Sequence, residues 1–219
     1  SETNTNFQKL EVLLFNENEL KQIPNSIDLC QNLLKIDLSA NKLNKLPDNF
    51  TKLKKLKHLT LSVNNISILP EEFGDCKNIE VIEIDNNQLS FLPATISKLK
   101  KLIFLDISYN QFYELDENWL HFPKLKHLNL DYNKLTNIPS EIYHLKKLEI
   151  LQINFNNLIE LPESIVNLEN LNTLTIAQNQ IQFLPKEIGK LKNLKTLILT
   201  GNPISKEEIA RIKKELPNC

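Results

Sequence analysis

Apolar residues recur along this chain in a unit of 23 residues. Counted from Leu33, the unit has apolar side chains at positions 1, 4, 6, 11 and 14, and a proline usually follows at position 15. The pattern returns without insertion or deletion from the unit that begins at Leu10 to the unit that begins at Leu194. The chain is therefore predicted to be one repeat array. Position 9 holds an asparagine in all nine units: Asn18, Asn41, Asn64, Asn87, Asn110, Asn133, Asn156, Asn179 and Asn202.

The alternation of apolar and polar residues around positions 4 and 6 predicts a short β-strand in every unit. Ile36 and Leu38 then point inward, while Asp37 and Ser39 point outward. Strands that follow one another in this way are joined by crossovers and are therefore parallel. Because each unit has only 23 residues, the crossovers are short and the units stack into a curved solenoid. The buried asparagines are expected to satisfy backbone groups where the chain leaves each strand.

The second half of the unit predicts a short helical turn. Proline at position 15 suits the first position of such a turn, where its missing N–H costs nothing. Acidic residues soon follow the proline, and lysine pairs stand near the end of the unit, an order that complements a helix dipole. The lysine pairs are therefore interpreted as solvated charges on the convex side. Examples of the two groups are Glu71 and Glu72, and Lys54 and Lys55.

The fifth unit departs from the repeat in its second half. Asp116 replaces the proline, and Trp119 and Phe122 replace the usual Ile and Leu. These larger side chains predict a locally repacked convex turn. A convex contact surface around Trp119 is the alternative.

Both ends of an open solenoid expose its core and need covers. At the C-terminal end, Ser205 and Glu208 form an S-x-x-E capping box before a predicted helix. Ile209, Ile212 and Leu216 share one face of that helix, which predicts a lid on the last unit. The predicted division is residues 1–9 as the remnant of an N-terminal cap, residues 10–204 as the array of nine units, and residues 205–219 as the capping helix and tail.

The whole unit, LxxLxLxxNxLxxLPxxIxxLxx, resembles the 23-residue class of the leucine-rich repeat family over nearly the whole chain. The resemblance implies an α/β solenoid shaped as a horseshoe, with a concave parallel sheet, short convex helical turns and a C-terminal capping helix. It also implies a non-catalytic protein–protein interaction module with a protein or peptide ligand on its concave face. The composition and the closing segment GNPISKEEIARIKKELPNC resemble secreted or surface proteins of this family from spirochaetes. That likeness implies a bacterial protein, secreted or on the cell surface, with a host factor as a candidate ligand; no export signal is visible after Ser1.

Composition argues against several other classes of protein. The 26 basic and 27 acidic residues nearly balance, so no global charge attracts nucleic acid or an anionic membrane. No apolar run approaches the roughly 18–20 residues of a membrane span, and no glycine-rich phosphate loop occurs. Cys30 and Cys76 occupy one core position two units apart, roughly 10 Å, which is too far for a disulfide. We expect no cofactor and a monomer.

One group of outward-facing residues stands apart on the predicted concave face. Tyr109, Tyr132 and Phe155 occupy position 8 in three consecutive units and should stack about 4.8 Å apart. Aromatic side chains supply much of the binding energy of protein interfaces. The alternative is that the column only packs on itself and covers the strand-exit loops. The predicted ligand-binding residues are this column, a second column beside it and four acids: Glu83, Asp85, Phe104, Asp106, Tyr109, His127, Asp131, Tyr132 and Phe155.

Catalytic and metal-binding functions lack a converging set of residues. His127 and Asp131 lie four residues apart on one strand, roughly 13 Å, and His127 with Asp106 supplies only two metal ligands. No nucleophile and base meet at a pocket, so neither an enzyme nor a metal site is expected. Two further functions stay open. One is an intracellular scaffold or regulator that uses the convex or lateral faces, and the other is a carbohydrate or small-ligand receptor that uses the stacked aromatics.

Overall fold

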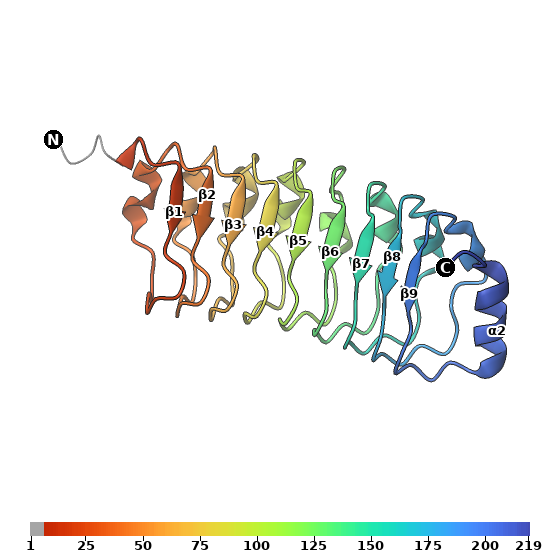
Figure 1. Cartoon of the computed structure of the whole chain (residues 1–219). Helices are drawn as coiled ribbons and strands as arrows, with labels where there is room; N and C mark the ends of the chain where they lie inside the picture. Colours follow the sequence, from red (N-terminus) through yellow and green to blue (C-terminus); the bar gives the residue numbers. More distant parts are fainter. Residues whose placement is uncertain (1–6) are drawn as a thin grey trace.

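Nine short strands lie side by side in one open sheet (Figure 1). The structure is a computed structural model that describes residues 7–219, except for the side chain of Trp119. Neighbouring strands are parallel and follow the order of the chain, as the repeat predicts. The strands are β1 (Val12–Leu14), β2 (Lys35–Asp37), β3 (His58–Thr60), β4 (Val81–Glu83), β5 (Phe104–Asp106), β6 (His127–Asn129), β7 (Ile150–Gln152), β8 (Thr173–Thr175) and β9 (Thr196–Ile198).

Short 3-10 helices complete the units, which confirms the predicted helical turns. A proline in extended conformation precedes most of them, for example Pro47 with φ of −71° before η2. Three to five residues remain for each turn, so the tighter 3-10 helix replaces an α-helix. The turns are η1 (Asn25–Leu29), η2 (Asp48–Lys52), η3 (Glu71–Asp75), η4 (Ala94–Lys98), η5 (Glu117–Trp119), η6 (Ser140–His144), η7 (Glu163–Asn167) and η8 (Ile188–Lys190), and the helix α2 (Lys206–Glu215) follows β9.

One continuous apolar core runs through the described part of the chain. Each strand pairs with the next at an offset of one unit, so that Ile36 lies opposite Leu59 and Leu59 opposite Ile82. These inward side chains are 0–2% exposed. Phe50 and Phe73 stack in the core of neighbouring turns with their ring centroids 6.5 Å apart. The fixed offset makes every unit bury its apolar face against the units next to it.

The asparagine column is structural, as predicted. The Asn64 side chain accepts a hydrogen bond from the backbone N–H of Leu43 at 2.9 Å, and its Nδ2 donates to the carbonyls of Leu38 and Leu61 at 3.0 Å. The same pattern recurs at the other buried asparagines, which are 6–9% exposed. Each amide therefore satisfies backbone groups of two adjacent units, groups that would cost roughly 1–3 kcal/mol each if left unpaired. The equivalent residues are Asn41, Asn87, Asn110, Asn133, Asn156 and Asn179.

Position 8 of the unit, just before the asparagine of the buried column, adopts the left-handed conformation in all nine units. Only the last unit has a glycine there, Gly201, with φ of 79°. The other eight have side chains, with φ between 49° and 57°. This backbone is costly for most L-residues and least so for Asn and Gly. The residues are Glu17, Ala40, Val63, Asn86, Tyr109, Tyr132, Phe155 and Gln178.

Val63 is the β-branched member of this set, and replacing it is expected to stabilise the fold. Val63→Asn should raise the free energy of unfolding by about 1 kcal/mol, because asparagine tolerates φ of 57° better than valine. Val63 is 47% exposed, so the change removes little buried apolar area. The reverse substitution one unit later, Asn86→Val, should lower the stability by a similar amount. Urea denaturation of both variants checks the pair, and a shift in the same direction for both would contradict the explanation.

The helix α2 covers the C-terminal end of the array (Figure 1). Ser205 caps it by accepting the backbone N–H of Glu208 at 3.1 Å. The reciprocal half of the predicted capping box is wrong, because the Glu208 carboxylate turns to the array and accepts the backbone N–H of Leu184 at 2.9 Å. The predicted residues share one side of the helix, where Ile212 and Leu216 are buried and Ile209 stays 41% exposed.

At the N-terminal end, an apolar groove of about 460 Å³ opens beside β1 and η1. Phe7 lines it and is 51% exposed. Residues 1–6 of the predicted cap remnant lie outside the described residues, so the proposed division at residue 9 stays a proposal.

The cysteines and the irregular fifth unit were the subject of two further predictions. Cys30, Cys76 and Cys219 are free thiols, as the spacing predicted for Cys30 and Cys76, and burial raises the pKa of Cys76 to about 12. In the fifth unit, Asp116 caps η5 by accepting the backbone N–H of Asn118 at 2.8 Å. Phe122 is fully buried there, in agreement with the predicted repacked turn, while the alternative of a contact surface around the Trp119 side chain falls outside the described part of the chain.

Candidate functional site

The predicted aromatic column stacks at the exits of three central strands. The ring centroids of Tyr109 and Tyr132 are 4.1 Å apart, with planes inclined by 12°. The centroids of Tyr132 and Phe155 are also 4.1 Å apart, with planes inclined by 10°. The rings are thus closer than the roughly 4.8 Å between strands, so they lean into face-to-face contact. All three side chains stay well exposed, at 50%, 38% and 43%.

The left-handed backbone at position 8 explains how the column forms. Similar φ values of 49°, 53° and 54° at Tyr109, Tyr132 and Phe155 send the three side chains out of the sheet in one direction. Two of the tyrosines also interact through their polar ends. A hydrogen bond with Tyr132 is the largest influence that raises the pKa of Tyr109, with smaller contributions from burial and from the charges of Tyr132 and Asp131.

The second predicted column is partly buried. Phe104 on β5 meets His127 on β6 edge to face, with centroids 4.5 Å apart. His127 Nε2 lies 2.7 Å from Gln152 Oε1 on β7, which is hydrogen-bonding distance. The His127 side chain is therefore held by residues of both neighbouring strands.

Asp106 and Asp131 make hydrogen bonds within the sheet. Asp106 Oδ1 accepts from the N–H and hydroxyl of Ser108 at 2.9 and 2.6 Å, and its Oδ2 accepts from Asn129 Nδ2 at 2.9 Å. Asp131 accepts the backbone N–H of Asn154 at 2.6 Å and its Nδ2 at 3.0 Å. Both carboxylates thus stabilise the strand exits, which the sequence did not predict. Burial raises the pKa of Asp131, and the bonds from Asn154 oppose that rise.

Glu83 and Asp85 are more open to a ligand than the two aspartates on β5 and after β6. The Thr60 hydroxyl donates to Glu83 Oε2 at 2.8 Å, and the Ser62 hydroxyl donates to Asp85 Oδ1. Among the described residues, no donor reaches the second oxygen of either carboxylate. The fourth unit therefore presents two acceptors that a partner could reach.

The structure brings the nine predicted residues onto one face, over β4 to β7, without enclosing them in a cavity. No group of three or more His, Cys, Asp or Glu side chains that could hold a metal ion occurs among residues 7–219 as described. A helix long and apolar enough to span a membrane is also absent from the described residues. The nine residues thus form an open surface that spans several units.

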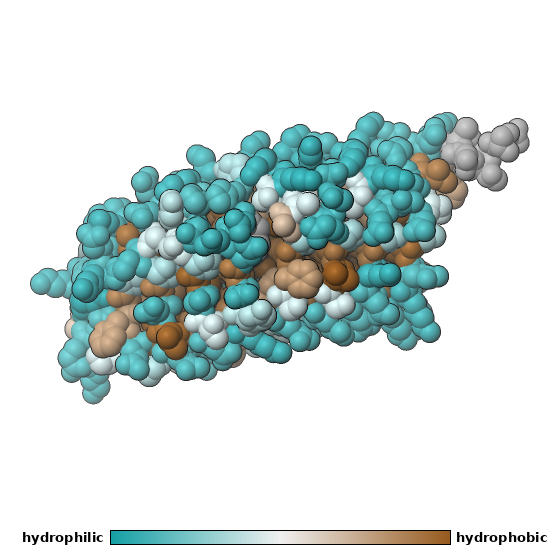
Figure 2. Space-filling model, turned by 180° about the vertical axis from the view of Figure 1, so that it is seen from behind, coloured by the Kyte–Doolittle hydropathy of each residue, from teal (hydrophilic) through white to brown (hydrophobic). Residues whose placement is uncertain are grey.

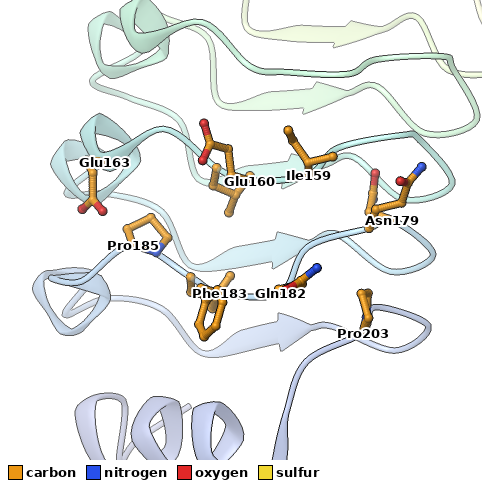
Figure 3. A pocket seen from close by; sticks show the side chains of 11 residues that line it. Ile159, Glu160, Glu163, Asn179, Gln182, Phe183, Pro185 and Pro203 are labelled. Atoms are coloured by element: carbon orange, nitrogen blue, oxygen red, sulfur yellow. The ribbon is translucent and has the colours of Figure 1, made fainter.

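A second surface on the face opposite the sheet was not predicted. Figure 2 shows brown side chains among polar ones on the face seen from behind. Two of the most exposed large apolar residues, Ile159 and Phe183 at 62% and 65%, border a groove of about 520 Å³ (Figure 3). Glu160 and Pro203 also line it. Apolar residues at positions 12 and 13 of several units were the available sequence signal: Ile68, Phe91, Ile159 and Phe183.

Comparisons with solved structures find similar arrays in bacteria and plants. A leucine-rich repeat protein of Leptospira interrogans is 29% identical, with a TM-score of 0.62, over 100% of this chain and 73% of its own. The ectodomain of the Arabidopsis thaliana receptor kinase GASSHO1/SCHENGEN3, in complex with Casparian strip integrity factor 2, is 28% identical, with a TM-score of 0.77, over 90% of this chain and 24% of its own. Internalin C2 from Listeria monocytogenes is 20% identical, with a TM-score of 0.81, over 90% of this chain and 84% of its own, and shows the shared fold alone.

Family models agree with these structures. A model described as leucine rich repeat matches residues 31–89, and one described as leucine-rich repeat region matches residues 116–218. No protein of curated function matches the sequence. Because both matched segments consist of the same 23-residue unit that builds the whole sheet, the chain belongs to the leucine-rich repeat proteins.

Proposed function

We propose that this chain is a protein-interaction module that binds a protein or peptide partner on its concave face, over β4 to β7. The supporting observation is the column of Tyr109, Tyr132 and Phe155, which is ordered by stacking yet 38–50% exposed. Large aromatic side chains held in one conformation lose little entropy when a partner covers them, which favours them as binding hot spots. The polar residues of the strand exits form the rim of this surface.

Similar proteins support a peptide or protein as the partner. The Arabidopsis receptor ectodomain was solved with a bound integrity factor, and a plant peptide hormone receptor, 27% identical over 90% of this chain, was solved with RGF2. This chain spans only 24% and 33% of those two proteins. The carbohydrate alternative has less support, because both faces of the Tyr132 ring are covered by neighbouring rings, which leaves only one face of each end ring for stacking with a sugar.

The proposal extends to the cellular setting. The likeness to a Leptospira protein, together with the composition, supports a bacterial protein that is secreted or exposed on the cell surface and that binds a host factor as a monomer. Protease treatment of intact bacteria that express the full gene, followed by detection of the chain, tests the location. Complete protection in intact cells and absence from the medium would contradict it.

The binding surface can be tested without knowing the partner beforehand. A photo-crosslinking residue in place of Gln178, beside the column, should capture the partner, whereas one in place of Gln182 on the opposite face should not. The partner identified at the first site is then purified, and its affinity is measured for the wild type and for the variant with Tyr109→Ala, Tyr132→Ala and Phe155→Ala.

The alanine variant should bind that partner at least about tenfold more weakly, because hot-spot residues cost more than about 1 kcal/mol each when truncated. Alanine is compatible with this backbone, since Ala40 occupies the same position in the second unit with φ of 51°. Phe183→Ala serves as the control for losing an exposed aromatic elsewhere. A fall in melting temperature with unchanged affinity would show that the column is only structural.

A further inference from the structure

Among the described residues, the four acids in the middle of the concave face form no ion pair with Lys or Arg, whereas several acids elsewhere on the molecule do. Ion pairs of the described residues lie at the strand entries, in the loops, on the convex turns and on α2, for example Lys57–Glu80 and Lys126–Glu149. None of them includes any of the four acids of the predicted site. The outward strand positions of the fourth to sixth units hold those four acids and neither Lys nor Arg. Like charges on adjacent strands repel one another, and a cationic partner would relieve that repulsion.

We propose that the partner presents a cationic peptide segment, and that one of its arginine side chains stacks on the outer face of Tyr109 beside Asp85. This inference rests on the concave binding surface proposed above and names the chemistry of what binds there. The occupant is a basic peptide or a basic segment of a folded protein.

The geometry of the column gives the position of that arginine. Tyr132 covers one face of the Tyr109 ring at a centroid distance of 4.1 Å. The opposite face looks toward the fourth unit, where Asn86 occupies the same position with φ of 53°. Asparagine is much shorter than tyrosine, so most of that ring face stays open above the Asn86 amide. A planar group of the partner fits there and continues the stack by one more layer.

The acids beside this open ring face favour a guanidinium. Asp85 immediately precedes Asn86, and Glu83 lies two residues earlier on β4. Each carboxylate has one oxygen bonded to a hydroxyl of the third unit and one oxygen free of donors from the described residues. Arginine is planar, stacks on aromatic rings and donates to carboxylates through several N–H groups at once. Lysine can pair with the carboxylates only as a point charge, so arginine should be preferred.

Defined peptides test this inference directly. Three blocked pentapeptides, Gly-Arg-Gly-Arg-Gly, Gly-Lys-Gly-Lys-Gly and Gly-Glu-Gly-Glu-Gly, are titrated into the isotopically labelled protein while NMR chemical shifts are recorded. The arginine peptide should shift the signals of Asp85, Asn86 and Tyr109 and bind several-fold more tightly than the lysine peptide. The glutamate peptide should shift none of them. Raising the salt concentration from 20 to 300 mM should lower the affinity of the arginine peptide, since exposed charge pairs are screened.

Two variants and a control separate the charge from the ring. Asp85→Asn keeps an oxygen that accepts the hydrogen bond of the Ser62 hydroxyl. It should lower the affinity of the arginine peptide about threefold, which is the effect expected for loss of an exposed ion pair. Tyr109→Leu should remove the preference for arginine over lysine. Asp48→Asn, which removes an exposed acid on a convex turn, should change neither.

Equal binding of the arginine and glutamate peptides, or equal effects of Asp85→Asn and Asp48→Asn, would overturn the inference. Its failure can be distinguished from failure of the proposed function. If the crosslinked partner binds more weakly to the variant with three alanines in the column, but equally well to Asp85→Asn and at high salt, the binding surface is supported and the cationic segment is rejected. A partner insensitive to both changes rejects both.

Discussion

Replacing Gly74 by alanine is expected to lower the free energy of unfolding by more than about 3 kcal/mol, at or beyond the upper end of ordinary overpacking. Gly74 lies buried in η3, and a Cβ added there would stand 1.7 Å from the carbonyl oxygen of Thr95 and 2.4 Å from its carbonyl carbon. Those atoms belong to the backbone of the next unit, so no side-chain rotation relieves the clash. The Thr95 hydroxyl also accepts the Gly74 N–H at 3.1 Å, a bond that the required shift would break.

A second glycine at the same position of a later unit provides the matched control. Gly189 stands at position 19 of its unit, as Gly74 does, but its nearest neighbour to an added Cβ is the Glu215 carbonyl oxygen at 3.0 Å. Gly189→Ala should therefore cost clearly less than Gly74→Ala. Urea denaturation followed by circular dichroism measures both. Equal midpoints for the two variants would show that the close approach at Gly74 relaxes freely.

Removing the Glu208 carboxylate should release the C-terminal cap. The Glu208 side chain is 6% exposed and accepts from Leu184 N–H at 2.9 Å, from Arg211 Nε at 2.8 Å and from Arg211 Nη2 at 2.7 Å. Arg211 in turn donates to the carbonyl of Leu184 at 3.0 Å. Breaking one side of a buried ion pair commonly costs about 3–5 kcal/mol, and the partly exposed Arg211 places Glu208→Ala near the lower end.

The loss should concentrate at one end of the molecule, because each unit of a solenoid contacts only its neighbours. Hydrogen exchange in Glu208→Ala should accelerate in α2 and around Leu184, while the amides of β1 to β4 keep their protection. Glu208→Gln retains an acceptor for Leu184 and should show a smaller effect. Lys206→Ala, at an exposed position of the same helix, should show almost none, and uniform acceleration along the whole array would contradict the local explanation.

The same contact predicts how stability depends on pH. The hydrogen bond from Arg211 is the main reason why the pKa of Glu208 lies below its usual value of 4.5, with smaller help from Leu184 N–H and from the charge of Arg211, and against burial. A lowered pKa in the folded state means that the contribution is fully present above pH 4.5 and is lost as the pH falls through the folded value. The wild type should therefore lose more stability between pH 6 and pH 3 than Glu208→Gln does.

Features that depend on the repeat register were predictable from the sequence. The strand phase, the buried asparagines and the unpaired cysteines all follow from one spacing, because a 23-residue unit fixes which residues meet across neighbouring strands. The stacking of Tyr109, Tyr132 and Phe155 follows from the same rule. Their binding role stays a prediction, since a register places side chains without identifying a partner.

Features that depend on a choice between local partners were not predictable. The S-x-x-E motif at Ser205 is compatible with a reciprocal capping box, but the free Leu184 N–H and the Arg211 guanidinium attract the Glu208 carboxylate instead. Likewise, the carboxylates of Asp106 and Asp131 bind donors at strand exits that only the folded backbone creates. The left-handed position 8 was hidden because side chains such as Val63 occupy it where glycine would have been the sign.

The asparagine ladder also has a consequence for how such a chain changes over generations. Each ladder amide joins its own unit to the preceding one by the same bonds, as at Asn64 and Asn133. Loss or duplication of a whole unit through recombination would create a junction of the kind already present between any two units. The sheet can thus be lengthened or shortened one strand at a time during evolution, while the contacts between units in the interior stay the same.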